Sequence, residues 1–243
     1  AVIRAAEDCR KPVILLTNRD FVQYAPPRHI GPVFADLAEH APVPVCLHLD
    51  HNSDFAVIRE ALEAGYSSVM YDGSALPLEE NIANSRQVVA WARAKGASVE
   101  GEVGSVAYTD KPESVTEFST PEEAERYARE SGVDALAVSV GTTHRSMVRC
   151  AEIRYELLDE IARRVPEPLV IHGTTSILEA DLVKMPRHGV AKYNAGTVLR
   201  LAYAQTLRQV LQQDSQIFDK VQFSREPLEA VYRAAKNLIE KVS

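Results

Sequence analysis

Four of the seven histidines in this chain lie at or just beyond the ends of short apolar runs. They are His48, His51, His144 and His172. Three imidazoles that converge from separate segments suit Zn²⁺ with one open position, which a catalytic metal needs to polarise a substrate oxygen. One histidine in such a place is more often a hydrogen-bonded core or loop residue. The coincidence on three segments favours a metal site.

Carboxylates stand beside these histidines. His48 and Asp50 are two residues apart, so they share one face of an extended segment, and His51 lies at the turn that follows. Asp50 could transfer a proton or hold the second nitrogen of a metal-bound histidine, and its position does not choose between these roles.

Other apolar runs end in acids as well, at Asp72, Glu100 and Glu102. Glu100 and Glu102 share a face, and an inward-facing acid is costly unless it is paired or binds a metal. For Glu100, a structural ion pair and a role in the site are both open.

Two turns have the composition of anion sites, His-Gly-Thr-Thr-Ser at residues 172–176 and Asn-Ala-Gly-Thr at residues 194–197. Each follows an apolar run and precedes a helical pattern, so free backbone N–H groups and the helix dipole could bind phosphate. Helix capping is the simpler alternative for each turn by itself. Arg145 is the cation that the sequence places nearby. The candidate anion-binding residues are Gly173, Thr174, Thr175, Ser176, Asn194, Gly196, Thr197 and Arg145.

Short apolar runs alternate with longer segments of helical period, which is the pattern of repeated βα units. The predicted strands are residues 12–17, 44–50, 67–72, 97–103, 135–140, 168–172 and 190–194. The predicted helices are residues 54–64, 78–94, 121–130, 155–165, 178–187, 197–213 and 226–242. Continuous apolar strands indicate a parallel sheet covered by helices. For this many units an α/β protein with a closed TIM (β/α)8 barrel is favoured, and an open doubly wound sheet is the alternative.

The predicted strands are one short of the eight of that barrel. Residues 1–9 have the pattern of the second half of a helix without a start signal, so we expect the first strand to lie upstream of Ala1. Residues 1–243 are expected to form a single domain. Its closing helices, residues 197–243, carry an apolar stripe that fits packing on the barrel or on a second subunit.

Composition and charge exclude several partners. The chain has 27 basic and 34 acidic residues, a formal charge of −7 and no Lys/Arg block, which argues against nucleic acid and anionic membranes. No stretch approaches the roughly 18 to 20 apolar residues of a spanning helix. Three cysteines without a CxxC pair favour a reducing compartment, so a cytoplasmic protein is expected.

Seven blocks of residues occur in a recognisable order and spacing. They are residues 48–51, 66–74, 78–82, 100–104, 141–144, 171–173 and 190–194. Together they closely resemble the class II, metal-dependent ketose-bisphosphate aldolases, which include the fructose- and tagatose-bisphosphate enzymes. The resemblance runs from about residue 1 to about residue 212. It implies an upstream first strand and helix, and a homodimer or homotetramer.

The resemblance also implies roles for the site residues. It implies that zinc is held by His51, His144 and His172. Asp72 and Glu102 would support alternative metal positions or the ligand shell. Asp50 transfers the proton at the aldehyde-derived oxygen, and Asn194 contacts the enediolate. Cleavage of a C–C bond beta to a ketone leaves a carbanion, whose charge a chelating metal spreads. Another divalent metal in place of zinc, and a monovalent cation near the phosphate, are further possibilities in this family.

The departures from the family pattern fall in one region. Arg145 stands where the family usually has Gly, and Asn52 stands where relatives tend to have Gly. Residues 172–176 replace a His-Gly-Gly-Ser-Gly turn, and Gly196 stands where Asn, Asp or Ala is common. Glycines let the backbone approach a phosphate, so these changes alter how an anion is held and leave every metal ligand in place.

The predicted function is reversible retro-aldol cleavage of a ketose (bis)phosphate by a zinc-dependent lyase, which releases dihydroxyacetone phosphate or an analogue and an aldehyde. One alternative is the same chemistry on a ketose whose carboxylate or sulfonate is bound by Arg145. Another is a non-catalytic relative that binds a sugar phosphate or a partner subunit, with weak or absent metal. Three ligands and an acid kept in register favour an enzyme.

Overall fold

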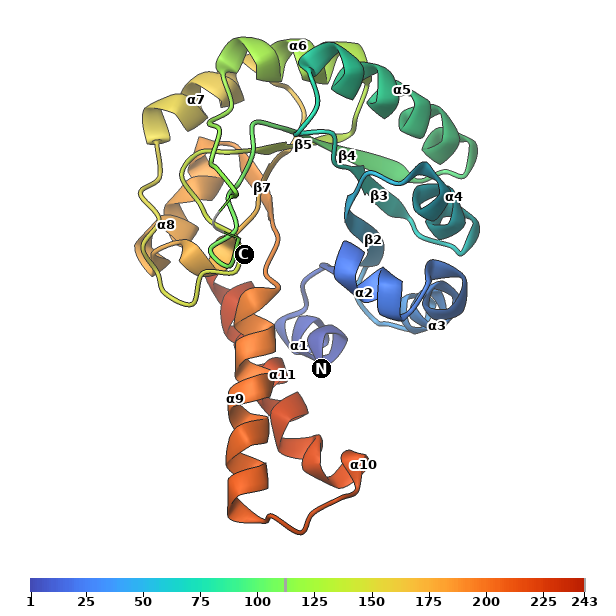
Figure 1. The fold of residues 1–243 in the computed structure, drawn as a ribbon, viewed down its shortest axis with the longest axis vertical. Coiled ribbons are helices and arrows are strands. Elements are labelled where there is room, and N and C mark those ends of the chain that lie inside the picture. Colours follow the sequence, from blue (N-terminus) through green and yellow to red (C-terminus); the bar gives the residue numbers. More distant parts are fainter. Residues whose placement is uncertain (112, 243) are drawn as a thin grey trace.

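The computed structural model describes residues 1–111 and 113–242, and its centre is a curled parallel sheet wrapped by helices (Figure 1). Within these residues the sheet contains seven strands, paired in sequence order. They are β1 (Val13–Asn18), β2 (Val45–Asn52), β3 (Ser68–Tyr71), β4 (Ser98–Val103), β5 (Ala135–Val138), β6 (Leu169–Ile171) and β7 (Val190–Tyr193). A doubly wound sheet would reverse its strand order part-way, so the sequential order excludes that alternative. The predicted α/β class and barrel arrangement are confirmed.

Helices cover the outer face of the curl. Those that match predicted segments are α4 (Phe55–Glu63), α5 (Leu78–Ala94), α6 (Pro121–Ser131), α7 (Tyr155–Arg164), α8 (Glu179–Lys184), α9 (Thr197–Gln213) and α11 (Arg225–Val242). The segment predicted at residues 178–187 ends its α-helix early and continues as a 3₁₀ turn, Met185–His188, because Pro186 has no N–H for an α-helical bond. At α6, Thr120 caps the first turn and Gly132 ends the helix with φ of 73°.

Some helices were not predicted. Between β1 and β2 the chain forms α2 (Arg19–Tyr24) and α3 (Pro27–Glu39), and neither helix was predicted. The helix α1 (Val2–Cys9) precedes β1 and agrees with the helical pattern expected over residues 1–9. The short α10 (Lys220–Phe223) connects the last two long helices. Pro32 lies inside α3, and a proline in a helix interior argues against a helix when the sequence is considered alone.

Two apolar cores hold the sheet. The larger core lies between the strands and the outer helices, and Leu136, Leu158 and Ile161 are among its fully buried members. A smaller core inside the curl is formed by Met70, Ala137 and Val170. Polar side chains from β2 and β4, and that of Asn194 directly after β7, occupy the rest of this interior, so the inside of the curl is polar toward the carboxyl ends of the strands.

The strands β1 and β7 are the two edges of the sheet in the described residues. A largely apolar cavity of about 1250 Å³ lies between them and the helices α1 and α11. The strand expected upstream of Ala1 stays a prediction.

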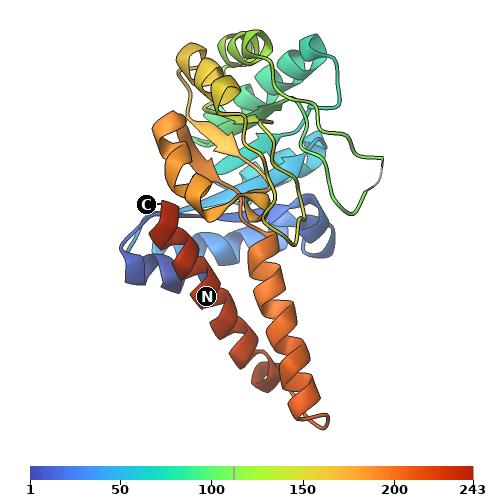
Figure 2. The same ribbon diagram turned by 90° about the vertical axis from the view of Figure 1, so that its left-hand side faces the viewer.

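The helices α9 and α11 form a two-helix arm that extends away from the sheet (Figures 1 and 2). The carboxyl-terminal part of α11 returns to the main body, where Leu238 and Val242 pack against the larger core. Among the described residues of α9 none is buried. The arm exposes large apolar side chains, which include Leu211, Phe218, Val221 and Leu228. No helix of the described part of the chain combines the length and the apolar character needed to cross a lipid bilayer.

Candidate functional site

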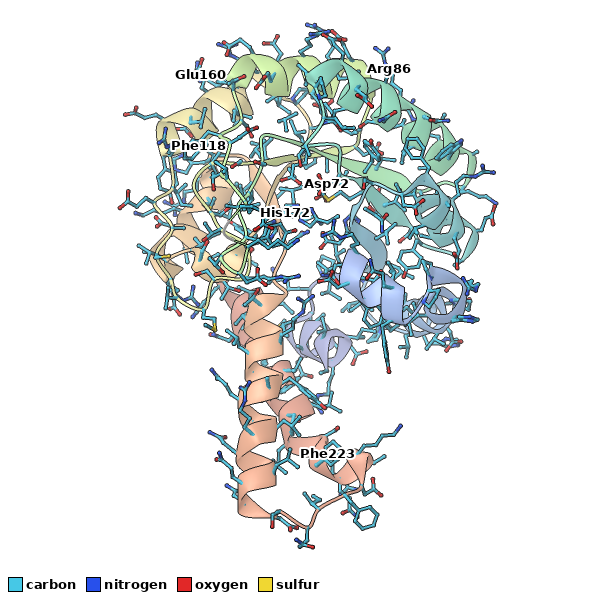
Figure 3. The ribbon with its side chains drawn as sticks, viewed as in Figure 1. Asp72, Arg86, Phe118, Glu160, His172 and Phe223 are labelled. Carbon is cyan, nitrogen blue, oxygen red and sulfur yellow. The ribbon has the colours of Figure 1, made fainter. Side chains whose placement is uncertain are left out.

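Three imidazoles meet at the carboxyl-terminal edge of the sheet. His51 lies near the end of β2, His172 follows β6 directly, and His144 lies in the loop after β5. Nδ1 of His172 is 2.6 Å from Nε2 of His51. The ring of His144 lies 4.9 Å from that of His51 and 5.7 Å from that of His172, measured between centroids. Figure 3 shows His172 and Asp72 projecting into the curl of the sheet.

The free ring nitrogens of this group fit a divalent cation. One nitrogen from each of the three histidines lies within 4.8 Å of the others. Nε2 of His144 is buried and has no hydrogen-bond partner among the described residues. Neutral imidazoles that turn lone pairs toward a common point are the ligands that Zn²⁺ prefers, so the donor set matches such an ion.

Two carboxylates orient the first of these imidazoles. Oδ2 of Asp72 lies 2.8 Å from Nδ1 of His51, which leaves Nε2 facing the centre of the group. A carboxylate oxygen of Glu102, Oε2, is 3.6 Å from the same Nδ1 and has no hydrogen-bond partner in the described chain. His51, Asp72 and Glu102 thereby form a second set of donors close enough for one cation.

Charge and burial act against each other in this cluster. Burial would lower the pKa of His51, but Asp50 and the hydrogen bond to Asp72 raise it to about 10. Burial would raise the pKa of Asp72, yet its hydrogen bond to His51 lowers it. Burial and then the charge of Asp72 raise the pKa of Glu102 well above 4.5. Asp72 is therefore held as a carboxylate beside His51, and a cation that binds Nε2 of His51 must displace a proton from that nitrogen.

Beneath the histidines lies a buried polar layer. Oε1 of Glu100 is 2.9 Å from Nε2 of His172, and its other oxygen, Oε2, is 2.6 Å from Nζ of Lys192. Glu100 is therefore both part of an ion pair and in contact with a candidate ligand. His48 hydrogen-bonds Ser68 at 2.8 Å, and burial, followed by the charge of Lys192, lowers its pKa to about 4. His48 is thus a neutral structural residue below the site.

The predicted proton-transfer residue has one direct partner in the site. Nδ2 of Asn194 donates to Oδ1 of Asp50 at 2.7 Å, and Oδ1 of Asn194 accepts from Lys192 at 2.5 Å. Asp50 is 6% exposed and Asn194 8%. Sequence reasoning missed Lys192. Its signal was present, because a residue two positions before Asn194 on a strand shares its face.

An open pocket adjoins the histidines, and both predicted turns contribute to its wall. Gly173, Thr174, Thr175, Gly196 and Thr197 line it, together with Asp50, His51, His144 and His172. Oγ1 of Thr174 is buried and has no partner within the described residues. Gly173 has φ of 69°, and a Cβ there would lie 2.5 Å from the carbonyl oxygen of Thr143. Only glycine gives this turn its close backbone approach.

Two of the turn residues form hydrogen bonds to other parts of the chain. Ser176 does not line the pocket; its hydroxyl accepts from the N–H of Thr143 and donates to the carbonyl of Gly173. Oγ1 of Thr175 accepts from the N–H of Val198 at 3.1 Å, so the first turn binds the start of α9. The helices α8 and α9 themselves have no side-chain capping hydrogen bond at their N-caps, so local capping by these turns is not observed.

Arg145 lines the pocket, but its positive charge is already balanced by two carboxylates. Its guanidinium group binds Asp20 and Asp110, each at 2.6 Å. The ring of Tyr108 stacks on the ring of His144, with their centroids 4.5 Å apart. The guanidinium carbon of Arg145 lies 5.5 Å from the centroid of the Tyr108 ring.

Two other cations reach the same pocket, Arg19 at the start of α2 and Arg200 in the first turns of α9. Neither forms an ion pair within the described part of the chain. Sequence reasoning missed both, because no local pattern links these positions to the histidines. The cations free to meet an anion are therefore Arg19 and Arg200, while Arg145 is neutralised.

Comparison with known proteins agrees with this geometry. The family model described as "Fructose-bisphosphate aldolase class-II" matches residues 1–243. A fructose-bisphosphate aldolase of Staphylococcus aureus is 32% identical over 249 residues, which covers 99% of this chain and 86% of that protein. A sulfofructosephosphate aldolase of Alkalicoccus urumqiensis is 33% identical over 215 residues, 87% of this chain and 75% of that protein. The crystal structure of the YdjI aldolase from Escherichia coli K12 superposes with a TM-score of 0.83 at 28% identity, over 100% of this chain and 85% of that one.

Proposed function

The chain belongs to the class II fructose-bisphosphate aldolase family, and on that premise we propose that this lyase cleaves a ketose phosphate by zinc-dependent retro-aldol chemistry. The observation that carries the proposal is the convergence of one ring nitrogen each from His51, His144 and His172, in which Nε2 of His51 lies 2.6 Å from Nδ1 of His172. Family membership makes the chain an enzyme, so the non-catalytic alternative is not retained.

His51, His144 and His172 would hold the ion, which when bound polarises the ketone and stabilises the negative charge that cleavage leaves. Asp50 accepts the proton of the hydroxyl group that becomes the aldehyde. Asn194 holds Asp50 through Nδ2 and presents an amide beside the reacting carbons. Burial of both side chains keeps water from competing for these contacts.

The anionic end of the substrate would bind at the two turns. The N–H groups at the start of α9, the hydroxyls of Thr174 and Thr197, and the guanidinium groups of Arg19 and Arg200 surround the pocket. Two relatives are named for fructose bisphosphate and for sulfofructose phosphate, which supports a phosphorylated ketose as the shared substrate class.

The alternative that Arg145 binds a carboxylate or sulfonate is less well supported. Asp20 and Asp110 already occupy its guanidinium group, so a substrate anion would have to displace one of them. Arg145 more simply closes one wall of the pocket by joining α2 to the loop that contains Asp110.

The proposal is tested by aldol cleavage assays on a panel of phosphorylated and unphosphorylated ketoses, with the protein as purified, after chelation, and after zinc is restored. Each arm is run with and without potassium, which tests for a monovalent cation. We expect turnover of a phosphorylated ketose, its loss on chelation and its return with zinc or another divalent ion. Turnover that is unchanged after complete metal removal would exclude this mechanism.

The exposed apolar side chains of the arm support assembly as a homodimer or homotetramer. Sedimentation at several concentrations of the wild-type protein and of a Leu211→Asp, Leu228→Asp variant tests this. A monomeric wild-type protein contradicts it.

All three cysteines are free, which supports the proposal that the enzyme is cytoplasmic.

A further inference from the structure

Lys192 extends from β7 into the interior of the curled sheet, where its ammonium group has two acceptors. Nζ lies 2.6 Å from Oε2 of Glu100 on β4 and 2.5 Å from Oδ1 of Asn194. The side chain of Lys192 is 13% exposed and that of Glu100 is 2% exposed. A buried ion pair must offset the desolvation of both charges, and further hydrogen bonds are what allow it to do so. The other contacts of Glu100 and Asn194 therefore show what this ion pair holds in place.

Glu100 connects Lys192 to a candidate metal ligand. Its second oxygen, Oε1, lies 2.9 Å from Nε2 of His172. Because a carboxylate only accepts hydrogen bonds, Nε2 must carry the ring proton of a neutral His172. The lone pair of His172 then lies on Nδ1, which is the nitrogen that faces His51. A hydrogen bond of this kind sets both the tautomer and the ring orientation of a metal ligand.

Asn194 connects Lys192 to the proton-transfer residue. An ammonium group only donates, so the end of the amide that faces Lys192 is the oxygen. The other end, Nδ2, donates to Oδ1 of Asp50 at 2.7 Å. The reversed amide would turn its NH₂ group toward an ammonium group and its oxygen toward a carboxylate. Lys192 therefore determines which end of Asn194 faces Asp50.

We propose that Lys192 is a positioning residue for the aldol reaction, which sets the tautomer of His172 through Glu100 and the amide orientation of Asn194 at the same time. Lys192 thereby orients both His172, a candidate metal ligand, and Asn194, the partner of Asp50. The inference rests on the proposed function for its effect on catalysis, but its effect on His172 and on metal binding is independent of the substrate.

Three variants separate the two connections. Lys192→Met removes both and leaves Glu100 buried without its cation. The double variant Lys192→Met, Glu100→Gln removes both without leaving that charge behind, so it keeps the fold where the single variant fails. Glu100→Gln alone keeps Lys192 beside Asn194 but lets an amide NH₂ face His172. Lys184→Met is the matched control, because its side chain is 60% exposed.

Two readouts do not depend on turnover. The ¹⁵N shifts of the His172 ring, recorded without added metal, identify the protonated nitrogen, and competition with a chelator gives the affinity for Co²⁺. We expect Nε2–H in the wild type, a shift toward Nδ1–H in Glu100→Gln, and mixed tautomers in the double variant. Affinity for Co²⁺ should fall about 10- to 100-fold both in Glu100→Gln and in the double variant. The value of kcat should fall more in the double variant than in Glu100→Gln, with little change in KM. Lys184→Met should behave as wild type.

An unchanged His172 tautomer together with unchanged Co²⁺ affinity in the folded double variant would overturn the proposal. Equal losses of kcat in Glu100→Gln and in the double variant would overturn the connection through Asn194. A wild-type protein that cleaves no ketose phosphate would overturn the proposed function instead, and the ¹⁵N and Co²⁺ measurements would still decide the role of Lys192.

Discussion

Asn194 donates a hydrogen bond of 2.7 Å to Asp50, although 144 positions separate the two residues along the chain. Asp50 belongs to β2 and Asn194 follows β7, so only the curl of the sheet brings them together. The contact holds one carboxylate oxygen of Asp50 and leaves the other available for a proton.

Replacing Asp50 with asparagine tests whether this carboxylate moves the proton. Asp50→Asn keeps the size of the side chain and an oxygen that accepts from Asn194, but an amide does not take up a proton at neutral pH. We expect kcat to fall about 10²- to 10⁴-fold, with a smaller change in KM, in steady-state assays. Asp36→Asn, whose side chain is 73% exposed, is the control and should keep the wild-type kcat. A kcat close to wild type in Asp50→Asn would assign the proton to another group.

Replacing Arg200 tests the anion site. Arg200→Met removes a guanidinium group that lines the pocket and has no ion pair among the described residues. We expect KM for a phosphorylated ketose to rise about 10- to 100-fold with kcat little changed, because a charge-assisted hydrogen bond is lost. Arg208→Met, two turns further along α9, is the matched control. An equal rise in KM in that control would mean that the effect is general electrostatics and not binding by Arg200.

The ion pair between Arg145 and Asp110 predicts a pH dependence. The hydrogen bond from Arg145 lowers the pKa of Asp110 below its ordinary value of 3.8. A carboxyl group whose pKa is lower in the folded state contributes stability above pH 3.8, and this contribution is lost as the pH falls through the folded pKa. Titration of the Asp110 carboxyl carbon by NMR should give a pKa below 3.8 in the wild type. In Arg145→Gln the pKa of Asp110 should rise toward the ordinary value, and equal values in both proteins would contradict the pairing.

Two glycines with nearly the same backbone angle offer a matched comparison. Gly173 has φ of 69° and a Cβ would lie 2.5 Å from a carbonyl oxygen, whereas Gly96 has φ of 70° and nothing within 4 Å. Gly96→Ala should cost about 1 kcal/mol of unfolding free energy, from the left-handed backbone alone. Gly173→Ala should cost at least about 1 kcal/mol more and weaken substrate binding, because the turn must move. Equal losses in urea unfolding would contradict a close approach at Gly173.

Much of the architecture was predictable, because it depends on local periodicity. Each predicted strand lies within two residues of an observed one, and the parallel α/β class follows from apolar runs that alternate with helical segments. The helix α3 was not predictable, since Pro32 in its interior argues against it locally and only packing in the folded chain stabilises it.

The sequence by itself determined which histidines and acids lie at strand ends, because parallel strands bring their carboxyl ends to a common edge. Only the tertiary structure decided which groups are paired and which are free. Arg145, predicted to meet an anion, is neutralised by Asp20 and Asp110, and Lys192, which was overlooked, reaches Glu100 across the interior of the curl. The physical reason is that charge pairing depends on distance through space, and the partners here come from segments whose separation along the chain carries no information about that distance.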